Sequence, residues 1–239
     1  MFKDFAAYLE ETSSAKLGVK LSFVQVEQFC RYGDMIVFWN ERVNLTSIVE
    51  PREVILKHFI DSLALARWLS GGKLADIGTG AGFPGIPLKI WLPELEVVLV
   101  DSLGKRVEFL QEVIKELNLK GTCAVHARAE EAGRNKDYRE QFDCVSSRAV
   151  ARLPVLLEYA IPLLKIGGRF LAAKGSQVEE EVAESTSALE ILGCRISAVE
   201  KFSLGEEAEH RAVIVVEKRR STPPAYPRKP GLPGKKPLG

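Results

Sequence analysis

The sequence predicts an α/β fold, in which a mostly parallel seven-stranded sheet has helices on both faces and follows an N-terminal helical extension. From Lys73 onward, short apolar runs alternate with amphipathic stretches, which is typical of strand–helix–strand units. Before Lys73, apolar residues recur at helical spacing. The 239 residues, 46% hydrophobic and 27% charged, suit one globular domain with a small addition.

The N-terminal region up to about residue 70 is expected to be helical. One apolar face runs from Phe23 to Trp39 at helical spacing. A second face begins after Pro51, a residue favoured in the first turn of a helix, and continues to Leu69. The pair Gly71–Gly72 is expected to end it.

Seven segments then read as strands. They are residues 73–78, 96–101, 121–127, 142–148, 169–174, 194–202 and 212–218. The last two are separated by an acidic loop that contains glycine, which predicts an antiparallel hairpin at the sheet edge. The clearest helix between strands has five apolar residues on one face, namely Leu103, Val107, Leu110, Ile114 and Leu117.

The segment after Glu217 is basic and rich in proline. Residues 218–239 hold seven Lys and Arg, no acids and six of the twelve prolines. Proline excludes a helix or a central strand, so we expect a solvated, extended basic arm. We therefore predict three regions: the helical extension 1–70, a domain at 71–217 and the basic tail 218–239.

The net charge of +1 combines two unlike parts. Without the tail, 26 Lys and Arg face 32 Asp and Glu, a charge of −6. Near-neutrality therefore does not exclude a nucleic-acid partner, but it requires attraction by local cationic features.

Several classes of protein are excluded. No apolar run approaches the 18 residues or so of a membrane-spanning helix, and the N-terminus lacks the apolar core of a signal peptide. The four cysteines lie far apart, without a C-x-x-C pair, so we expect neither a metal nor a redox centre. We expect a cytoplasmic protein.

A glycine-rich loop follows the first strand and opens a helix. Residues 75–85 read ADIGTGAGFPG, and glycines there let the backbone approach a ligand and adopt positive φ. Although Gly80 to Gly85 matches the dinucleotide pattern G-x-G-x-x-G, two features argue against NAD. Asp76 is placed to accept hydrogen bonds from an ammonium group, and Pro84 removes an amide donor that a pyrophosphate would use.

Acidic residues follow the next two strands. Asp101 ends the second, where a carboxylate can bind both hydroxyls of a ribose; its alternative role is to cap the helix that starts near Leu103. Ala129 and Glu130 follow the third strand, at a position that suits an adenine, and they equally suit an acidic helix start. The combination of an acid before G-x-G-x-G, Asp76, and an acid that ends the second strand, Asp101, resembles the Rossmann-like class I methyltransferases, which implies S-adenosylmethionine as cofactor.

The segment after the fourth strand bears on the methyl acceptor. It reads SSRAV and lacks both an Asn/Asp-Pro-Pro-Tyr/Phe tetrapeptide and a Pro-Cys nucleophile. Guanine N7 suits such a site, because it offers a lone pair and loses no proton, so alignment is sufficient. Arg148 can hydrogen-bond a guanine edge, stack on it or hold the cofactor carboxylate; alternatively, it is a surface arginine paired with an acid.

Longer segments carry a closer resemblance. They are NLTSI, KHFIDSLAL, ADIGTGAGFPGIPL, DSLGKRVEFLQEV, ARAEE, SRAVARL and IPLLKIGGRFLAAKG. On these the chain is identified as a member of the ribosomal small-subunit methyltransferase G family, also known as glucose-inhibited division protein B. The resemblance covers residues 39–175, with an echo in YPRKPGLPGKKPL. It implies 7-methylation of guanosine 527 (reference nucleotide numbering) in 16S ribosomal RNA.

The resemblance also implies functional residues. Together with the acids and glycines above, the expected cofactor contacts are Asp76, Gly78, Gly80, Phe83, Asp101, Ser102, Leu103, Ala129, Glu130 and Arg148. Val150 departs from the Phe of many members, which bears on how a base would pack. No general base is required, so no catalytic residue is assigned beyond Arg148 as a candidate for orientation.

Candidates for RNA contact are cations near the strand tips and in the tail. They are Lys105, Arg106, Lys174, Arg228, Lys229, Lys235 and Lys236. His58 lies on an apolar face and is interpreted either as a buried structural histidine or as an active-site group. The expected partner is 16S rRNA or a small-subunit ribonucleoprotein particle, with the protein a monomer. Alternatives are a methyltransferase acting on small molecules or proteins, and an NAD-dependent oxidoreductase or catalytically silent nucleotide-binding module.

Overall fold

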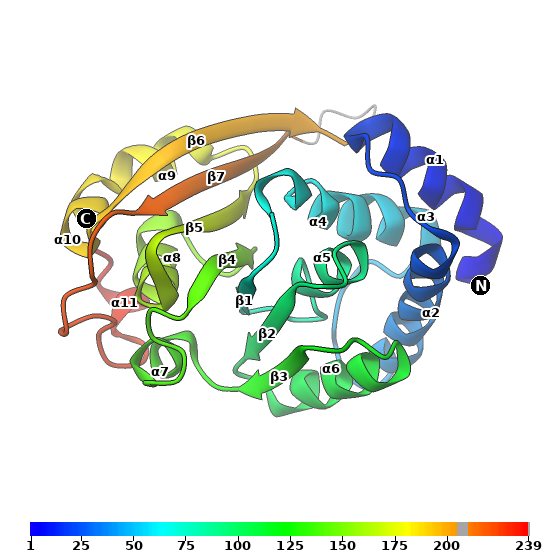
Figure 1. Cartoon of the computed structure of the whole chain (residues 1–239), viewed down its shortest axis with the longest axis horizontal. Coiled ribbons are helices and arrows are strands. Elements are labelled where there is room, and N and C mark those ends of the chain that lie inside the picture. Colours follow the sequence, from blue (N-terminus) through cyan, green and yellow to red (C-terminus); the bar gives the residue numbers. More distant parts are fainter. Residues whose placement is uncertain (205–209, 239) are drawn as a thin grey trace.

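The strands form one sheet in the order β3-β2-β1-β4-β5-β7-β6 (Figure 1). The computed structural model describes residues 1–204 and 210–238. The strands are β1 (Lys73–Ile77), β2 (Glu96–Asp101), β3 (Thr122–His126), β4 (Phe142–Arg148), β5 (Leu164–Lys174), β6 (Cys194–Ser203) and β7 (His210–Lys218). β1 to β5 are parallel, whereas β7 pairs antiparallel with β5 and β6. The predicted mostly parallel, seven-stranded sheet is confirmed.

The largest difference in strand bounds from the prediction is at β5. β5 begins at Leu164 instead of Arg169, and its first half contains Gly167 with φ +83° and a register shift against β4. Such an irregular start does not follow from apolar periodicity. The last two strands pair as predicted, but β7 lies inside the sheet and β6 forms its edge. The predicted acidic loop between them falls mainly on residues 205–209, outside the described residues.

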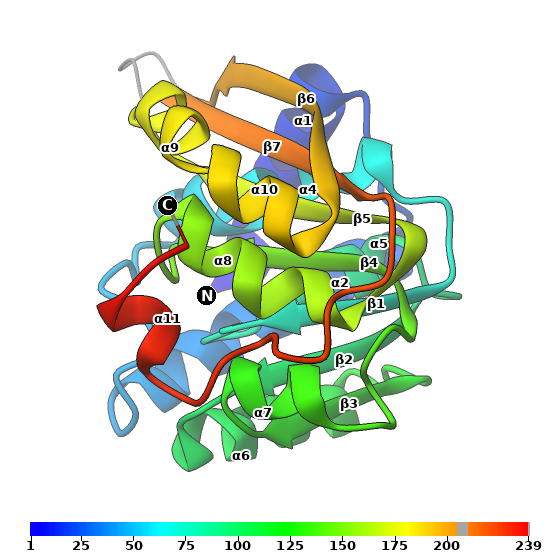
Figure 2. The same ribbon diagram turned by 90° about the vertical axis from the view of Figure 1, so that its left-hand side faces the viewer.

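Helices cover both faces of the sheet (Figures 1 and 2). One face packs against α5 (Gly85–Trp91), α6 (Gly104–Glu116) and the N-terminal helices. The other face packs against α7 (Ala129–Arg134), α8 (Leu153–Ala160), α9 (Val178–Glu184) and α10 (Thr186–Leu192). Successive strand residues alternate between these two cores, as a strand's pleat requires: Leu74 belongs to the first and Ala75 to the second.

The N-terminal region is helical, as predicted. Its elements are η1 (Phe2–Phe5), α1 (Ala6–Leu17), α2 (Phe23–Asn40), α3 (Pro51–Val54), η2 (Ile55–Ile60), α4 (Asp61–Leu63) and η3 (Ala66–Trp68). α2 begins with a capping box, in which Ser22 and Gln25 each accept the other's backbone N–H. η2 is a π-helical turn, a feature that often occurs at functional sites.

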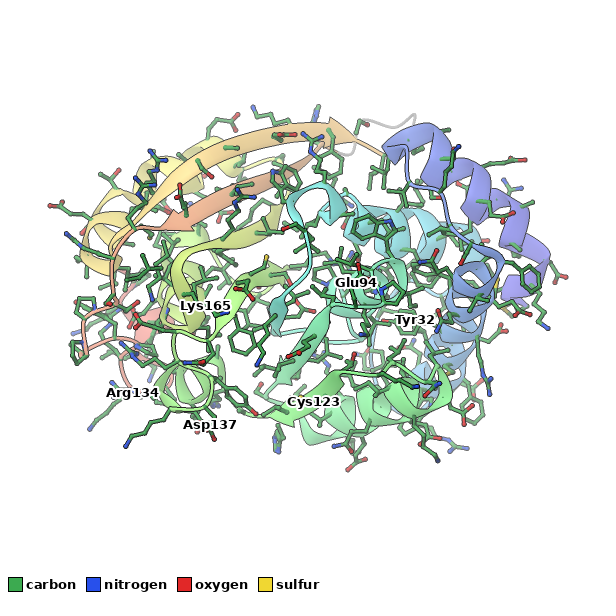
Figure 3. All side chains as sticks on the ribbon, in the orientation of Figure 1. Tyr32, Glu94, Cys123, Arg134, Asp137 and Lys165 are labelled. Atoms are coloured by element: carbon green, nitrogen blue, oxygen red, sulfur yellow. The ribbon has the colours of Figure 1, made fainter. Side chains whose placement is uncertain are left out.

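The N-terminal helices share a core with the sheet and pack against the glycine loop. The ring of Phe59 in η2 lies within 6.2 Å, centroid to centroid, of Phe2, Phe29, Tyr32 and Phe83. The buried Tyr32 hydroxyl donates to the carbonyl of Ala81 inside the glycine loop. Tyr32, labelled in Figure 3, thereby connects α2 to the loop after β1.

The basic tail is not the solvated, extended arm that the sequence predicts. It crosses α7 and α8 and includes a short helix, α11 (Leu232–Lys235), with Pro233 at its second position, where proline is tolerated (Figure 2). Lys218 at its start is fully buried, and its Nζ donates to Glu140 and to two backbone carbonyls. Pro227, Pro233 and Leu238 are also buried. The prediction failed because it weighed the prolines and charges but could not locate the acids that pair with them.

Within residues 1–204 and 210–238, no helix is long and apolar enough to span a bilayer. The same residues contain no group of three or more His, Cys, Asp or Glu side chains arranged to hold a metal ion.

Candidate functional site

The carboxyl ends of β1 to β4 meet at one edge of the sheet, and two neighbouring cavities open there. The smaller, which we call the β2 cavity, measures about 180 Å³ and is lined by Gly78, Asp101, Ser102, Ala129, Glu130 and Tyr159 among others. The larger, the β4 cavity, measures about 570 Å³ and is lined by Lys57, His58, Asp61, Arg148, Lys174 and Arg211 among others. Val150 lines both cavities and so separates them.

Glycine is required at Gly78 for two reasons. Its φ is +65°, a left-handed conformation that other residues rarely adopt. A Cβ there would also lie 2.4 Å from Cγ2 of Val150, so any side chain would collide with the loop after β4. The glycine therefore lets that loop close over the end of β1, between the two cavities.

Asp76 lies beneath the glycine loop rather than at a cavity. It is completely buried, and its carboxylate accepts hydrogen bonds from the Thr79 hydroxyl at 2.6 Å, the Gly85 amide at 2.9 Å and the Ser146 hydroxyl at 2.9 Å. Burial raises the pKa of Asp76 to about 6, although these hydrogen bonds oppose the shift. The expected contact between Asp76 and an ammonium group does not fit this placement. We assign the residue to holding the loop in shape.

Asp101 ends β2 and lies at the wall of the β2 cavity. Its Oδ2 accepts the Gly80 amide at 2.8 Å and its Oδ1 accepts the Leu103 amide at 2.9 Å. Each carboxylate oxygen can accept a second hydrogen bond, and Asp101 lines the β2 cavity. The capping role and the ribose role, which the sequence left as alternatives, are therefore compatible.

The other expected cofactor residues divide into two groups. Gly78, Ser102, Ala129 and Glu130 line the β2 cavity. Gly80, Phe83 and Leu103 are absent from the linings of both cavities. Gly80 orients Asp101, Phe83 packs beneath Arg148, and Leu103 is half exposed at the start of α6.

Arg148 is held by four groups at the wall of the β4 cavity. Its Nη1 donates to the Lys57 carbonyl and to Asp61 Oδ2, both at 2.9 Å. Its Nη2 lies 3.1 Å from Nδ1 of His58, and its guanidinium lies 4.8 Å from the Phe83 ring centroid. The side chain is only 15% exposed, so Arg148 is a fixed cation rather than a mobile surface arginine.

His58 is neutral in this setting. Burial and the neighbouring Arg148 cation lower its pKa to about 3. Nδ1 of His58 lies 3.1 Å both from Nη2 of Arg148, which can only donate, and from the Lys57 carbonyl oxygen, which can only accept, and Nε2 lies 2.9 Å from the Thr46 hydroxyl. His58 also stacks on Phe83 at 4.6 Å. It is thus a partly buried, hydrogen-bonded residue that also lines the β4 cavity.

Lys174 lies at the β4 cavity but is engaged by the protein. Its Nζ contacts Glu181 and the Ala151 carbonyl, both at 2.6 Å, and its side chain is 7% exposed. Glu181 in turn accepts the Leu153 amide at 2.6 Å. The pair therefore braces the loop of residues 149–152. This placement does not support Lys174 as a free contact for RNA phosphate.

The remaining RNA candidates differ in accessibility. Lys105, Lys229, Lys235 and Lys236 are exposed. Arg106 is partly buried, with its guanidinium 3.8 Å from Asp101 and its Nε unpaired. Arg228 is engaged in an ion pair with the buried Glu158. Four of the seven cations therefore remain open to a partner.

Sequence reasoning missed Asp61 and Arg211, which form an ion pair beside Arg148 at the wall of the β4 cavity. Asp61 accepts from Arg148, and its Oδ1 lies 3.4 Å from Nε of Arg211 on β7. An acid within the apolar face of KHFIDSLAL was the available sign for Asp61. Nothing in the local sequence of Arg211 indicated that β7 would bring it to the site.

Comparisons with known proteins fit this arrangement. A model of the family described as rRNA small subunit methyltransferase G matches residues 25–211. The chain is 64% identical to "Ribosomal RNA small subunit methyltransferase G" of Desulfitobacterium hafniense (strain Y51), over 100% of both chains. It is 52% identical to the protein of the same name from Acetivibrio thermocellus, over 92% of both chains.

Solved structures share the fold at low sequence identity. M. jannaschii TYW2 in complex with AdoMet aligns with a TM-score of 0.53 and 17% identity, covering 67% of this chain and 77% of that one. A ribosomal protein L11 methylase from Lactobacillus delbrueckii subsp. bulgaricus aligns with a TM-score of 0.53 and 13% identity, covering 69% and 79%. The fold is thus that of the class I methyltransferases.

Proposed function

The chain belongs to the rRNA small subunit methyltransferase G family, and we propose that it transfers the methyl group of S-adenosylmethionine to N7 of a guanosine in 16S rRNA, guanosine 527 in reference numbering. The observation that carries the proposal is the meeting of the two cavities at Val150. One is lined by carboxylates that suit a nucleoside, and the other by fixed cations beside the end of β4.

The residues of the β2 cavity fit the cofactor. Asp101 offers acceptors for ribose hydroxyls, and Ala129 and Glu130 provide the wall where an adenine would lie. Gly78 leaves room for the loop after β4 to approach closely, since a side chain there would collide with Val150. When bound, S-adenosylmethionine supplies an electrophilic methyl group. Gly80 orients Asp101, the Leu103 amide donates to the same carboxylate, Phe83 packs against Arg148, and Asp76 shapes the glycine loop.

The residues of the β4 cavity suit a guanine that reacts without a base. Arg148 is a rigid donor for a guanine edge or for the cofactor carboxylate. The histidine that lines this cavity, His58, has a pKa of about 3, so it is a poor proton acceptor. N7 of guanine carries no proton, so positioning of the reacting atoms is the main task left to the protein.

We also propose a cellular location, a partner and an oligomeric state for the enzyme. An enzyme that modifies 16S rRNA acts where ribosomal subunits are assembled, so we propose a cytoplasmic location. We propose naked 16S rRNA or a small-subunit particle as its partner, and a monomer as its working form. The helical extension, the methyltransferase domain and the basic tail remain the proposed division of the chain.

Two measurements test the function. Titration calorimetry should show binding of S-adenosylhomocysteine and none of NADH; the reverse would point to an oxidoreductase. Mapping of 16S rRNA by chemical cleavage at 7-methylguanosine should detect the modification after incubation with the enzyme and not with Arg148→Ala. An unmodified guanosine, with methylation of a protein or small molecule instead, would overturn the proposal.

A further inference from the structure

The C-terminal segment, residues 219–238, is fastened to the protein along its length (Figure 2). Arg139 donates to the carbonyls of Thr222 at 2.9 Å and Tyr226 at 2.8 Å. The Thr222 amide donates to Glu140 at 3.0 Å, and Pro227 packs against Gly133 of α7. The path of the segment is therefore set by contacts with α7, which begins at the β2 cavity, and with the turn that follows α7.

The strongest of these contacts joins Arg228 to Glu158 of α8. Glu158 is completely buried, and its two carboxylate oxygens accept from Nε and Nη2 of Arg228 at 2.6–3.1 Å and from the Arg228 amide at 2.7 Å. Nη2 also donates to the Lys236 carbonyl at 2.7 Å, which ties the far side of the segment to the same point. A buried carboxylate without its partner is strongly unfavourable, so Glu158 holds Arg228 in place.

Three residues beyond Arg228, the segment reaches the wall of the β2 cavity. The Gly231 amide donates to Oε1 of Glu130 at 2.8 Å. Glu130 is 3% exposed and lines the cavity together with Tyr159. Gly231 has φ +80°, a conformation that favours glycine at this turn. A residue implicated in cofactor contact is thus fixed by the distant end of the chain.

We propose that the C-terminal segment is a positioning element for cofactor binding: Arg228 anchors the segment on Glu158, and the Gly231 amide orients Glu130 at the cavity wall. This inference rests on the proposed function, because it takes the β2 cavity as the cofactor site. A carboxylate that is ordered before the ligand arrives loses less conformational freedom on binding, and affinity rises accordingly.

Calorimetry with S-adenosylhomocysteine tests the proposal on the full chain. Arg228→Met should raise the Kd about tenfold, and Arg228→Lys should recover part of the loss because it keeps the charge. The KM for S-adenosylmethionine should rise while kcat and the KM for rRNA change little. Lys229→Met is the matched control, since it removes an exposed cation next to the anchor, and its Kd should equal that of the unaltered protein.

Hydrogen–deuterium exchange on the unaltered protein gives an independent measurement if Arg228→Met does not fold. S-adenosylhomocysteine should slow exchange in residues 228–236, because coupling between two sites is reciprocal. Unchanged exchange there, or a Kd that Arg228→Met leaves alone while the KM for rRNA rises, would overturn the proposal in favour of an RNA-binding tail. If the unaltered protein bound no S-adenosylhomocysteine, the proposed function would fail together with this inference.

Discussion

At the tip of β2, the Asp101 carboxylate combines a structural and a proposed binding task. It accepts the amides of Gly80 and Leu103 and faces the β2 cavity. Asp101→Ala should weaken S-adenosylhomocysteine binding by about 1.5–3 kcal/mol, the range for hydrogen bonds to a charged acceptor. Titration calorimetry measures this affinity, and the control is Asp137→Ala, which alters an exposed carboxylate (Figure 3). Equal affinities in both variants would remove Asp101 from the binding site.

His58 gives the protein a predictable dependence on pH. Its pKa is about 3 in the folded chain and about 6.5 when unfolded. Between these values the unfolded chain binds the extra proton, so this group's contribution is complete above pH 6.5 and is lost as pH falls toward 3. The slope is at most about 1.4 kcal/mol per pH unit.

Urea unfolding at several pH values measures this effect. His58→Gln should have a smaller loss of stability on acidification than the unaltered protein. Asp76 contributes the opposite slope, because its raised pKa of about 6 favours the folded state below pH 3.8 and that contribution is lost as pH rises to 6. Comparing the two proteins at each pH removes the Asp76 contribution. Parallel curves would show that the pKa of His58 is not lowered in the folded protein.

At the scale of single residues, the sequence predicts which strand end each acidic residue occupies but not the direction in which its side chain points. Asp101 and Glu130 were predicted from their places after strands and do line the β2 cavity. Asp76 was predicted at the same edge, yet its side chain points below the loop, because Thr79, Gly85 and Ser146 offer it three donors. Spacing along the chain shows which strand tip a residue occupies, whereas its partners decide which way it faces.

At the scale of secondary-structure elements, an ion pair joins β5 to α9 beside the β4 cavity. Lys174 and Glu181 form an ion pair with side chains 7% and 11% exposed, which braces the loop carrying Val150. Removing one partner of a buried pair is destabilising by about 3–5 kcal/mol. Lys174→Met should therefore lower the free energy of unfolding by about 3 kcal/mol and reduce methylation.

The same helix provides a control for that experiment. Lys201 pairs with Glu179 of α9 on the surface, where both side chains are more than 60% exposed. Lys201→Met should change stability by less than about 1 kcal/mol. Similar losses from Lys174→Met and Lys201→Met would contradict the bracing role.

Long periodic elements were predictable, and short irregular ones were not. β2 and β4 have the predicted bounds, and α6 carries the predicted apolar face. The π-helical turn of η2 and the four-residue α11 are too short to show such periodicity. In η2 the Lys57 carbonyl accepts from Arg148, and α11 packs against α8. Tertiary contacts at those places override what local composition favours.

Over the whole molecule, the acidic body and the basic tail predicted from the sequence are not separate, because some cations of the tail pair with acids of the body. The tail's cations divide into partners of acids in the body, namely the buried Lys218 and the partly buried Arg228, and exposed side chains. The exposed set comprises Arg219, Arg220, Lys229, Lys235 and Lys236. Neutralising the three lysines of this set should weaken rRNA binding. It should also lower the slope of log K against log salt by about 1 for each phosphate that the protein no longer neutralises.

Filter binding of an rRNA fragment at several salt concentrations measures this slope. S-adenosylhomocysteine affinity should stay unchanged in the triple variant, which distinguishes the tail's lysines from its Arg228 anchor. A slope equal to that of the unaltered protein would exclude these lysines from the RNA interface.

The position of β7 has a consequence for biosynthesis. β7 lies between β5 and β6 although it follows both in the chain. During N- to C-terminal synthesis, β6 therefore emerges before the only strand it pairs with in the described sheet, and β5 keeps an open hydrogen-bonding edge. The nascent chain is exposed to wrong strand pairing until residue 218 is made, which makes the interval between β5 and β7 the stage at which a chaperone would be most useful.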